Sequence, residues 1–431
     1  MSEGPKGAPP GDRGRPTERR PDSNPWCGRP TTERGHEPEL RLVPGREKSL
    51  LQRHPWIFSG AIAGVSGAPT AGDTVGVRAA DGRWLARAAF SPDSQIRARV
   101  WSFDPAEVVD EAFFDRRIGA ACRARADFTD AAHTGCRLIH GESDGLPGVI
   151  ADRYGDVVVV QLGTTGAERW REAIVGALQR HASASCVYER SDAEAREREG
   201  LPARNGPLAG ELPAEVTVVE DGITYVVDVA GGQKTGFYLD QRDSRARVRA
   251  LARGREVLNV FCYTGGFTLA ALAGGATRAL SIDSSGTALD LARVSLARNP
   301  SFAQDAAEWR DADAFAELRR LRDAAASFDL IVVDPPKLAP TAKHAEKAAR
   351  AYKDINLLAL KLLRPGGLLA TFSCSGGVDA ALFRKIVAGA ALDARADAAV
   401  IGHFAASADH PSSLAFPEGE YLKGLLLRKA G

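Results

Sequence analysis

Three short motifs in the C-terminal half of the chain carry side chains that can do chemistry. They are Asn259 to Phe267 (NVFCYTGGF), Asp334 to Lys337 (DPPK) and Ser373 to Ser375 (SCS). Each motif follows an apolar run of the kind that forms a buried strand. Because the carboxyl ends of parallel strands meet at one edge of a sheet, we expect the three motifs to share one crevice.

The first motif predicts a turn that holds a cofactor. An apolar strand over 256–261 breaks at Thr264, Gly265 and Gly266, and glycine both adopts left-handed backbone angles cheaply and lets a ligand approach closely. A second strand over 278–282 ends in Asp283, whose carboxylate is placed to accept hydrogen bonds from two ribose hydroxyls. This arrangement suits either a dinucleotide or S-adenosylmethionine.

The choice between these cofactors follows from a missing glycine. A dinucleotide requires the complete Gly-x-Gly-x-x-Gly pattern for its pyrophosphate, and the chain lacks it. S-adenosylmethionine has no phosphate and requires a backbone cradle, a carboxylate for the ribose and a polar contact for adenine. Asp313, which follows another strand end, either provides that contact or caps a helix. The predicted cofactor residues are Asn259, Phe261, Tyr263, Thr264, Gly265, Gly266, Asp283 and Asp313.

The composition of the chain limits its domain number, its compartment and its binding partners. The chain has 431 residues, 44% of them apolar, which suffices for two or three domains with cores of their own. No apolar run approaches the roughly 20 residues of a membrane span, so we expect a cytoplasmic protein. The 6 cysteines show no paired C-x-x-C spacing and no His-Cys cluster, so we expect neither a disulfide framework nor a metal site. The net charge of +1 neither supports nor excludes an RNA partner.

The patterning predicts four segments. Residues 1–37 are rich in Pro, Gly, Arg and Glu and nearly free of apolar residues, so we expect disorder. Residues 38–106 contain five short strand patterns, which predict a small β-barrel. Residues 107–215 mix helices and strands as in a compact α+β domain. In residues 216–431 strands alternate with helices, which predicts an α/β Rossmann-like sheet.

Several longer blocks resemble a known family. They are HPWIFSG from His54, GESDGLPGVIADRY from Gly141, YERS from Tyr188 and GQKTGFYLDQR from Gly232, together with the cofactor motifs. From about Leu40 the chain is similar to the PUA-domain class I rRNA methyltransferases, the RlmI-like family of 23S rRNA cytosine-C5 methyltransferases. The resemblance implies a PUA barrel that binds RNA, a central α+β domain and a C-terminal Rossmann-like methyltransferase domain. It does not extend to residues 1–37.

The resemblance also implies roles for single residues. The Ser-Cys-Ser cysteine of the family is its nucleophile, and in this chain that residue is Cys374. Similar proteins close the segment that begins at Gly232 over S-adenosylmethionine. In that segment Gln241 and Arg242 become cofactor candidates and Lys234 a substrate candidate, and Gln233 and Phe237 also become candidates for cofactor or nucleotide contacts. The alternative for the segment is a hairpin and a helix start with charges that face solvent.

A cysteine in this place suits chemistry at cytosine C5. That carbon is a poor nucleophile until a thiolate adds to C6 and forms an enamine that can attack the sulfonium methyl group. A protonated Asp334 in a dry pocket could donate a hydrogen bond to cytosine N3 and favour this addition. Pro335 and Pro336 fix the backbone beside the base, and Lys337 contacts the substrate or solvent. No second cysteine lies beside DPPK, so the base that removes the C5 proton stays open.

Three other functions are alternatives to methylation of cytosine C5. An N-methylase acting on a purine amino group would share the fold and cofactor and leave Cys374 idle. A nonenzymatic RNA-binding protein would not bind S-adenosylmethionine, and an NAD-dependent oxidoreductase would bind a nicotinamide cofactor.

The RNA and its partners add further expectations. A target base in folded RNA would have to be flipped into the pocket. In the barrel, three arginines and two tryptophans could contact RNA, and a homodimer stays open. These five residues are Arg78, Arg97, Arg99, Trp56 and Trp84.

Overall fold

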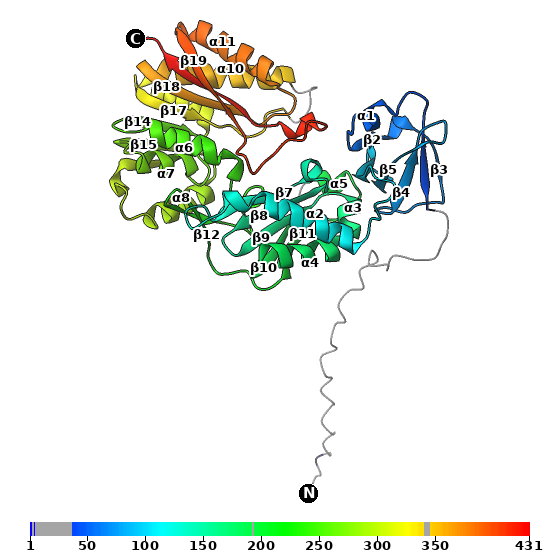
Figure 1. The fold of residues 1–431 in the computed structure, drawn as a ribbon. Coiled ribbons are helices and arrows are strands. Elements are labelled where there is room, and N and C mark those ends of the chain that lie inside the picture. The colour runs from blue at the N-terminus through cyan, green and yellow to red at the C-terminus, as the bar shows by residue number, and fades with distance from the viewer. Residues whose placement is uncertain (2–3, 5–36, 192–193, 340–344) are drawn as a thin grey trace. The chain divides into compact units, whose positions relative to one another are not determined.

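The computed structural model describes residues 1, 4, 37–191, 194–339 and 345–431 (Figure 1). The disorder that we expect for residues 1–37 therefore falls, apart from residues 1, 4 and 37, outside the described residues. His36 to Gly431 forms one compact unit. No helix in the described part of the chain is long and apolar enough to cross a membrane.

The N-terminal sheet has six strands in the order β2-β6-β5-β4-β1-β3. It consists of β1 (Glu39–Leu42), β2 (Trp56–Phe58), β3 (Ile62–Ser66), β4 (Thr74–Arg78), β5 (Trp84–Phe90) and β6 (Ile96–Ser102), with helix α1 (Lys48–Leu51) after β1. Alternating side chains such as Leu40, Val75 and Val77 form its core. The sequence pattern missed β3, because this edge strand buries none of its residues and so shows no alternation.

The second sheet has five strands in the order β11-β10-β9-β8-β7. Its elements are α2 (Glu111–Ala124), β7 (Gly135–His140), β8 (Val149–Tyr154), β9 (Val157–Leu162), α3 (Thr165–Arg169), α4 (Arg171–Ala182), β10 (Cys186–Ser191), α5 (Glu194–Glu197) and β11 (Arg204–Ala209). Val158 and Val160 of β9 pack with α2 and α4, whereas Val157 and Val159 belong to the core on the other side of the sheet. Burial on both faces explains the continuous valine run.

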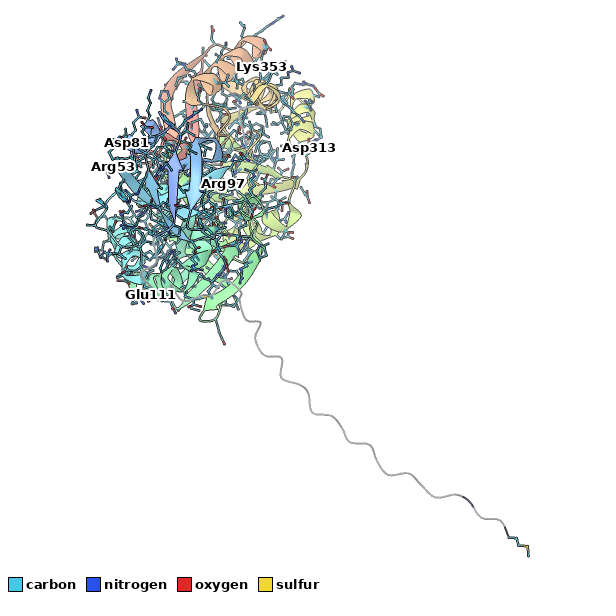
Figure 2. All side chains as sticks on the ribbon, turned by 90° about the vertical axis from the view of Figure 1, so that its right-hand side faces the viewer. Arg53, Asp81, Arg97, Glu111, Asp313 and Lys353 are labelled. Atoms are coloured by element: carbon cyan, nitrogen blue, oxygen red, sulfur yellow. The ribbon has the colours of Figure 1, made fainter. Side chains whose placement is uncertain are left out.

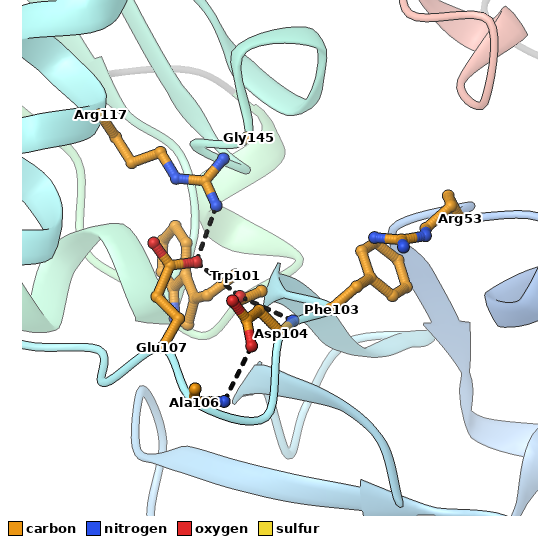
Figure 3. A pocket seen from close by; sticks show the side chains of 9 residues that line it. Arg53, Trp101, Phe103, Asp104, Ala106, Glu107, Arg117 and Gly145 are labelled. Atoms are coloured by element: carbon orange, nitrogen blue, oxygen red, sulfur yellow. Dashed lines mark hydrogen bonds and ion pairs between the residues drawn. The ribbon is translucent and has the colours of Figure 1, made fainter.

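A pocket of about 540 Å³ lies where β6 leads into α2 (Figure 3). Glu107 accepts hydrogen bonds there from Ser102 Oγ at 2.6 Å and from Arg117 Nη2 at 2.9 Å. Arg53 lies 5.2 Å above the ring of Phe103. Because Glu107 and Arg53 already have partners within this pocket, we interpret the pocket as part of the connection between the two sheets.

A hairpin of β12 (Val216–Glu220) and β13 (Ile223–Val227) leads to a seven-stranded sheet in the order β16-β15-β14-β17-β18-β20-β19. Its strands are β14 (Glu256–Val260), β15 (Arg278–Asp283), β16 (Ala307–Asp311), β17 (Phe328–Val333), β18 (Leu363–Ser373), β19 (Ala398–Ala405) and β20 (Lys423–Lys429). The first five are parallel, and β20 runs antiparallel to both β18 and β19. The expected Rossmann-like sheet is therefore present.

Helices cover both faces of this sheet. They are α6 (Arg242–Leu251), α7 (Gly266–Ala273), α8 (Gly286–Ala297), α9 (Ala314–Asp323), α10 (Ala345–Leu362) and α11 (Ala380–Ala394). Side chains of α6, α7 and α8 share one core cluster, and those of α9, α10 and α11 share another. Successive residues of β14, Val257 and Leu258, belong to these two clusters on opposite faces of the sheet, as period-2 alternation requires.

The order of the strands determines where a site can form. From β14 the chain adds β15 and β16 on one side and then returns to add β17 on the other. Ligands bind at such a reversal, beyond the carboxyl ends of the strands. Val333 pairs in register with Val260 of β14 and with Thr371 of β18. The residues that follow these three strands are therefore brought together. The exact limits of the four predicted segments stay predictions.

Candidate active site

A cavity of about 450 Å³ lies at the carboxyl ends of β14, β17 and β18. Most of the predicted site residues line it: Phe261, Tyr263, Thr264, Gly266, Asp283, Lys234, Gln241, Asp334, Pro335, Pro336, Lys337 and Cys374. The cofactor turn, the DPPK motif and the Ser-Cys-Ser motif thus share one crevice, as their positions after parallel strands predict. Their individual roles stay predictions.

The cofactor turn between β14 and α7 has an unusual backbone. Phe261 and Tyr263 have positive φ angles of 62° and 48°, and Gly265 has 76°. A Cβ on Gly265 would lie 2.7 Å from the ring of Trp309, so this position requires glycine for space as well as for conformation. Positive φ costs energy in residues other than glycine and tends to occur where a ligand is held. The turn therefore fits the predicted cradle.

Asp283 ends β15 beside this turn. Its Oδ2 accepts the backbone N–H of Tyr263 at 2.7 Å, and its Oδ1 accepts that of Ser285 at 3.0 Å. These bonds fix the orientation of the carboxylate. Because each oxygen can accept more than one hydrogen bond, both can still bind the hydroxyls of a ribose. The residue thus fits its predicted role.

Four predicted cofactor residues do not line the cavity: Asn259, Gly265, Arg242 and Asp313. The fully buried Asn259 donates from Nδ2 to Thr268 Oγ1 at 2.8 Å. Arg242 donates to Asp409 Oδ2 at 2.6 Å. Neither side chain lines the cavity, and a contact of either residue with the cofactor stays a prediction.

The sequence allows two interpretations of Asp313, a contact with adenine or a helix cap, and the structure shows the helix cap. Its Oδ1 accepts the N–H of Ala316 at 2.8 Å, so the side chain caps α9, and it lies at the surface (Figure 2). The contact with adenine stays a prediction.

These two carboxylates give a matched pair of variants. We expect Asp283→Ala to weaken binding of S-adenosylhomocysteine by roughly 10-fold to 100-fold, because a charge-assisted hydrogen bond contributes about 1.5–3 kcal/mol. Asp313→Ala should change that affinity less than 3-fold and act mainly on stability, by about 1 kcal/mol for a lost helix cap. Isothermal titration calorimetry and thermal melting separate the two effects. Equal losses of affinity would show that both carboxylates hold the cofactor.

The segment from Gly232 to Arg242 lies along the cavity, as expected for a closing segment. The hydroxyl of Tyr263 accepts the N–H of Gln233 at 2.8 Å and donates to the carbonyl of Gly236 at 3.2 Å. The segment is therefore attached to the cofactor turn. Gln233, Lys234, Phe237 and Gln241 all line the cavity.

A buried carboxylate network stands beside the catalytic candidates. Asp240 accepts hydrogen bonds from Lys234 Nζ at 2.9 Å and from Tyr421 Oη at 2.5 Å. Burial alone would raise the pKa of Asp240, but Lys234 and His410 lower it well below the ordinary value. Asp240 thus stays ionised. Sequence reasoning assigned no role to Asp240 or Tyr421. The GQKTGFYLDQR block contained the signal for Asp240, whereas the sequence around Tyr421 indicated only a strand.

Asp334 follows β17 at the centre of the cavity. Gln241 Nε2 donates to its Oδ2 at 2.9 Å. Burial, followed by the negative charge of Asp240, raises the pKa of Asp334 to about 7. Near neutral pH this carboxyl is therefore protonated in a large fraction of molecules. A buried acid of this kind can donate a hydrogen bond to a base, which is the role that the sequence predicts.

Cys374 follows β18 and is held by its neighbours. The side chains of Ser373 and Ser375 both hydrogen bond to Tyr352 Oη, at 2.9 and 3.0 Å, and Lys423 Nζ donates to the carbonyl of Ser375 at 2.8 Å. Burial, and next the charge of Asp334, raises the pKa of the Cys374 thiol. Protonation of Asp334 therefore favours the thiolate. Negative charge on Asp334 and ionisation of Cys374 therefore oppose each other.

The expected RNA contacts of the N-terminal sheet are only partly available. Arg78 pairs with Glu39 at 2.6 Å, and the buried Arg99 pairs with Glu199 at 2.8 Å. Arg97, labelled in Figure 2, makes no ion pair with the described residues. We therefore expect Arg97 to contribute more to phosphate binding than the other two arginines.

The sheet order, the glycine turn and the carboxylate after β15 define an S-adenosylmethionine-dependent methyltransferase. The family model described as S-adenosylmethionine-dependent methyltransferase matches residues 195–421, and that of a PUA-like domain matches residues 40–103. A Streptococcus mutans protein described as a SAM-dependent methyltransferase has the same fold, with a TM-score of 0.78 at 21% identity over 90% of this chain and 99% of that one. A methyltransferase solved with SAH gives a TM-score of 0.79 at 22% identity, over 90% and 99% of the two chains.

Closer relatives show the family. The chain is 50% identical over 392 residues to the ribosomal RNA large subunit methyltransferase I of Shewanella denitrificans, covering 90% of this chain and 98% of the relative. It is 49% identical over 391 residues to that of Cronobacter sakazakii, covering 89% and 98%. The chain belongs to the ribosomal RNA large subunit methyltransferase I family, the RlmI family. The predicted fold class, cofactor and family are confirmed.

Proposed function

We propose that this chain methylates C5 of a cytosine in large-subunit (23S) ribosomal RNA through a cysteine thiolate. One observation supports the proposal above all: Cys374 and the partly protonated Asp334 line the same cavity as the cofactor turn. The relatives named as large-subunit rRNA methyltransferases supply the class of RNA. Such a substrate implies work in the cytoplasm, where ribosomes are assembled. The proposal requires no second copy of the chain.

The mechanism assigns a step to each side chain. The Cys374 thiolate adds to C6 of the cytosine while Asp334 donates a hydrogen bond to N3, so negative charge that develops on the ring is stabilised. C5 becomes nucleophilic and takes the methyl group, which S-adenosylmethionine supplies when bound. A base, whose identity stays open, then takes the C5 proton, the C5=C6 double bond forms, and the C6–S bond breaks to release the Cys374 thiolate. The buried, ionised Asp240 and its partner Lys234 stand beside this reaction and keep the site polar.

The product of the reaction distinguishes this proposal from its alternatives. The protein is incubated with large-subunit rRNA and S-adenosylmethionine carrying a labelled methyl group, and the RNA is digested to nucleosides for mass spectrometry. We expect the label in 5-methylcytidine. Label in a methylated purine would move the protein to the N-methylase function. Failure to bind S-adenosylmethionine, together with no transfer to rRNA, would support a nonenzymatic RNA-binding protein.

A further inference from the structure

A second cavity, of about 940 Å³, lies next to the active site. Lys234, Glu418 and Tyr421 line both cavities and so form the wall between them. The remaining walls come from the N-terminal sheet, the five-stranded sheet and the loop before β20. The mechanism above makes no use of this space.

One part of the second cavity is lined by fixed aromatic rings. Trp56 Nε1 donates to Glu142 Oε1 at 2.8 Å, and the ring of Phe416 lies 4.9 Å from that of Trp56, centroid to centroid. The rings of His140 and Tyr421 are stacked, with centroids 6.2 Å apart. Aromatic side chains that are already held in place are the surfaces on which proteins stack unpaired bases of RNA.

His140 also presents a hydrogen-bond donor of fixed position. Its Nδ1 lies 3.1 Å from Arg137 Nη1, and since a guanidinium only donates, Nδ1 accepts and the ring proton resides on Nε2. Burial, and next the charge of Arg137, holds the pKa of His140 far below its ordinary value, so the ring is neutral. In the described part of the chain, no hydrogen bond occupies the Nε2–H group.

Arg196 is held in the wall of the second cavity. Its side chain is 1% exposed, and Nε and Nη1 donate to the carbonyls of Pro202 and Leu162 at 2.7 and 2.6 Å. Nη2 has no hydrogen-bond partner among the described residues, although Arg196 lines the cavity. Because Nη2 is itself buried, it does not face the cavity, and the hydrogen bonds of Nε and Nη1 hold the side chain within the wall.

The remaining charges argue against a site for phosphate alone. Arg99 pairs with Glu199 at 2.8 Å, and Arg137 pairs with Asp152 at 2.7 Å. These guanidinium groups are neutralised by buried acids, so the cavity offers ring faces and the Nε2–H donor of His140. That combination suits a nucleobase, which has a π-face and acceptor atoms at its edge.

We propose that the second cavity binds the base of a nucleotide next to the target cytosine. The inference rests on the proposed function, because it places the target base in the adjoining active site. The neighbouring base leaves its stack together with the target, packs against the aromatic rings and accepts a hydrogen bond from His140 Nε2. Acceptors such as guanine O6 or N7, or O2 of a pyrimidine, match this donor.

Short RNA ligands test this inference without methyl transfer. Calorimetry compares cytidine monophosphate with the dinucleotides that carry each of the four bases on either side of cytidine, with the protein saturated in S-adenosylhomocysteine. We expect at least one dinucleotide to bind roughly 10-fold more tightly than the monophosphate, because one base stacked on aromatic rings contributes about 1–3 kcal/mol. This gain should vanish in His140→Leu and in Trp56→Leu, which alter different elements, and return in part in His140→Gln, which restores a donor.

Two results would overturn the inference: no dinucleotide exceeds the monophosphate, or the gain persists in both leucine variants. Thermal melting of each variant confirms that it folds. One result would contradict the proposed function and still support base binding in the second cavity. In that result rRNA acquires no 5-methylcytidine, but a dinucleotide binds more tightly than the monophosphate and this difference depends on His140. If 5-methylcytidine forms but no dinucleotide binds more tightly than the monophosphate, only the inference about the second cavity is contradicted.

Discussion

Replacement of Cys374 by alanine should abolish methyl transfer to rRNA. We expect kcat to fall by at least roughly 1,000-fold, since removal of a covalent nucleophile leaves only the contribution of binding and orientation. Binding of S-adenosylhomocysteine should stay within about 3-fold of wild type, because the cofactor turn and Asp283 lie on other strands. Initial rates with a labelled methyl donor, and calorimetry, measure the two quantities.

Cys262 provides the matched control, because it lines the same cavity but lies within the cofactor turn. Its side chain is 5% exposed, and burial raises its thiol pKa well above the ordinary value. Cys262→Ala should therefore retain transfer, apart from any change in affinity for the cofactor. Transfer that survives in Cys374→Ala and is lost in Cys262→Ala would contradict the assignment. Unchanged transfer in both variants would favour methylation of a purine amino group.

The parts of the site that follow strands were predictable from sequence. Asp283, Asp334 and Cys374 each come directly after an apolar run, and parallel strands bring such positions to one edge regardless of the detailed packing. The same reasoning could not show which residues of the motifs line the cavity and which do not. Asn259 lies within β14 and donates to Thr268, and it does not line the cavity.

Contacts between distant segments were beyond sequence reasoning. Tyr421 reaches Asp240 across 181 positions, and Trp56 reaches Glu142 across 86, through loops whose paths no periodicity encodes. The raised pKa of Asp334 has the same origin, because it depends on burial and on the nearby charge of Asp240. The sequence motif indicated a carboxyl at the site, and the fold determines its protonation.

The protonation of Asp334 should appear in the pH dependence of transfer. As the pH rises through about 7, Asp334 loses its proton and with it the hydrogen bond to cytosine N3, so the wild-type rate should fall on the alkaline side. Asp334→Asn has an amide that donates at every pH and no proton to lose. We expect a rate lower by roughly 100-fold or more, and no alkaline decline that depends on residue 334. Asp313→Asn, at an exposed helix cap, should keep the wild-type profile.

Asp334→Asn should raise the stability of the fold while it lowers the rate of methyl transfer. Because the folded pKa of Asp334, about 7, lies above the ordinary value of 3.8, its favourable contribution to folding is complete below about pH 4 and is lost as pH rises through about 7. Asparagine does not ionise, so Asp334→Asn should gain stability relative to wild type as pH rises, by up to roughly 4 kcal/mol. Denaturant unfolding at acid and alkaline pH measures the gain. Two results together would contradict this role: a stability difference between wild type and Asp334→Asn that is independent of pH, and a pH–rate profile that the substitution does not change. Asp334 would then titrate as an ordinary carboxyl and could not serve as the proton donor to the base.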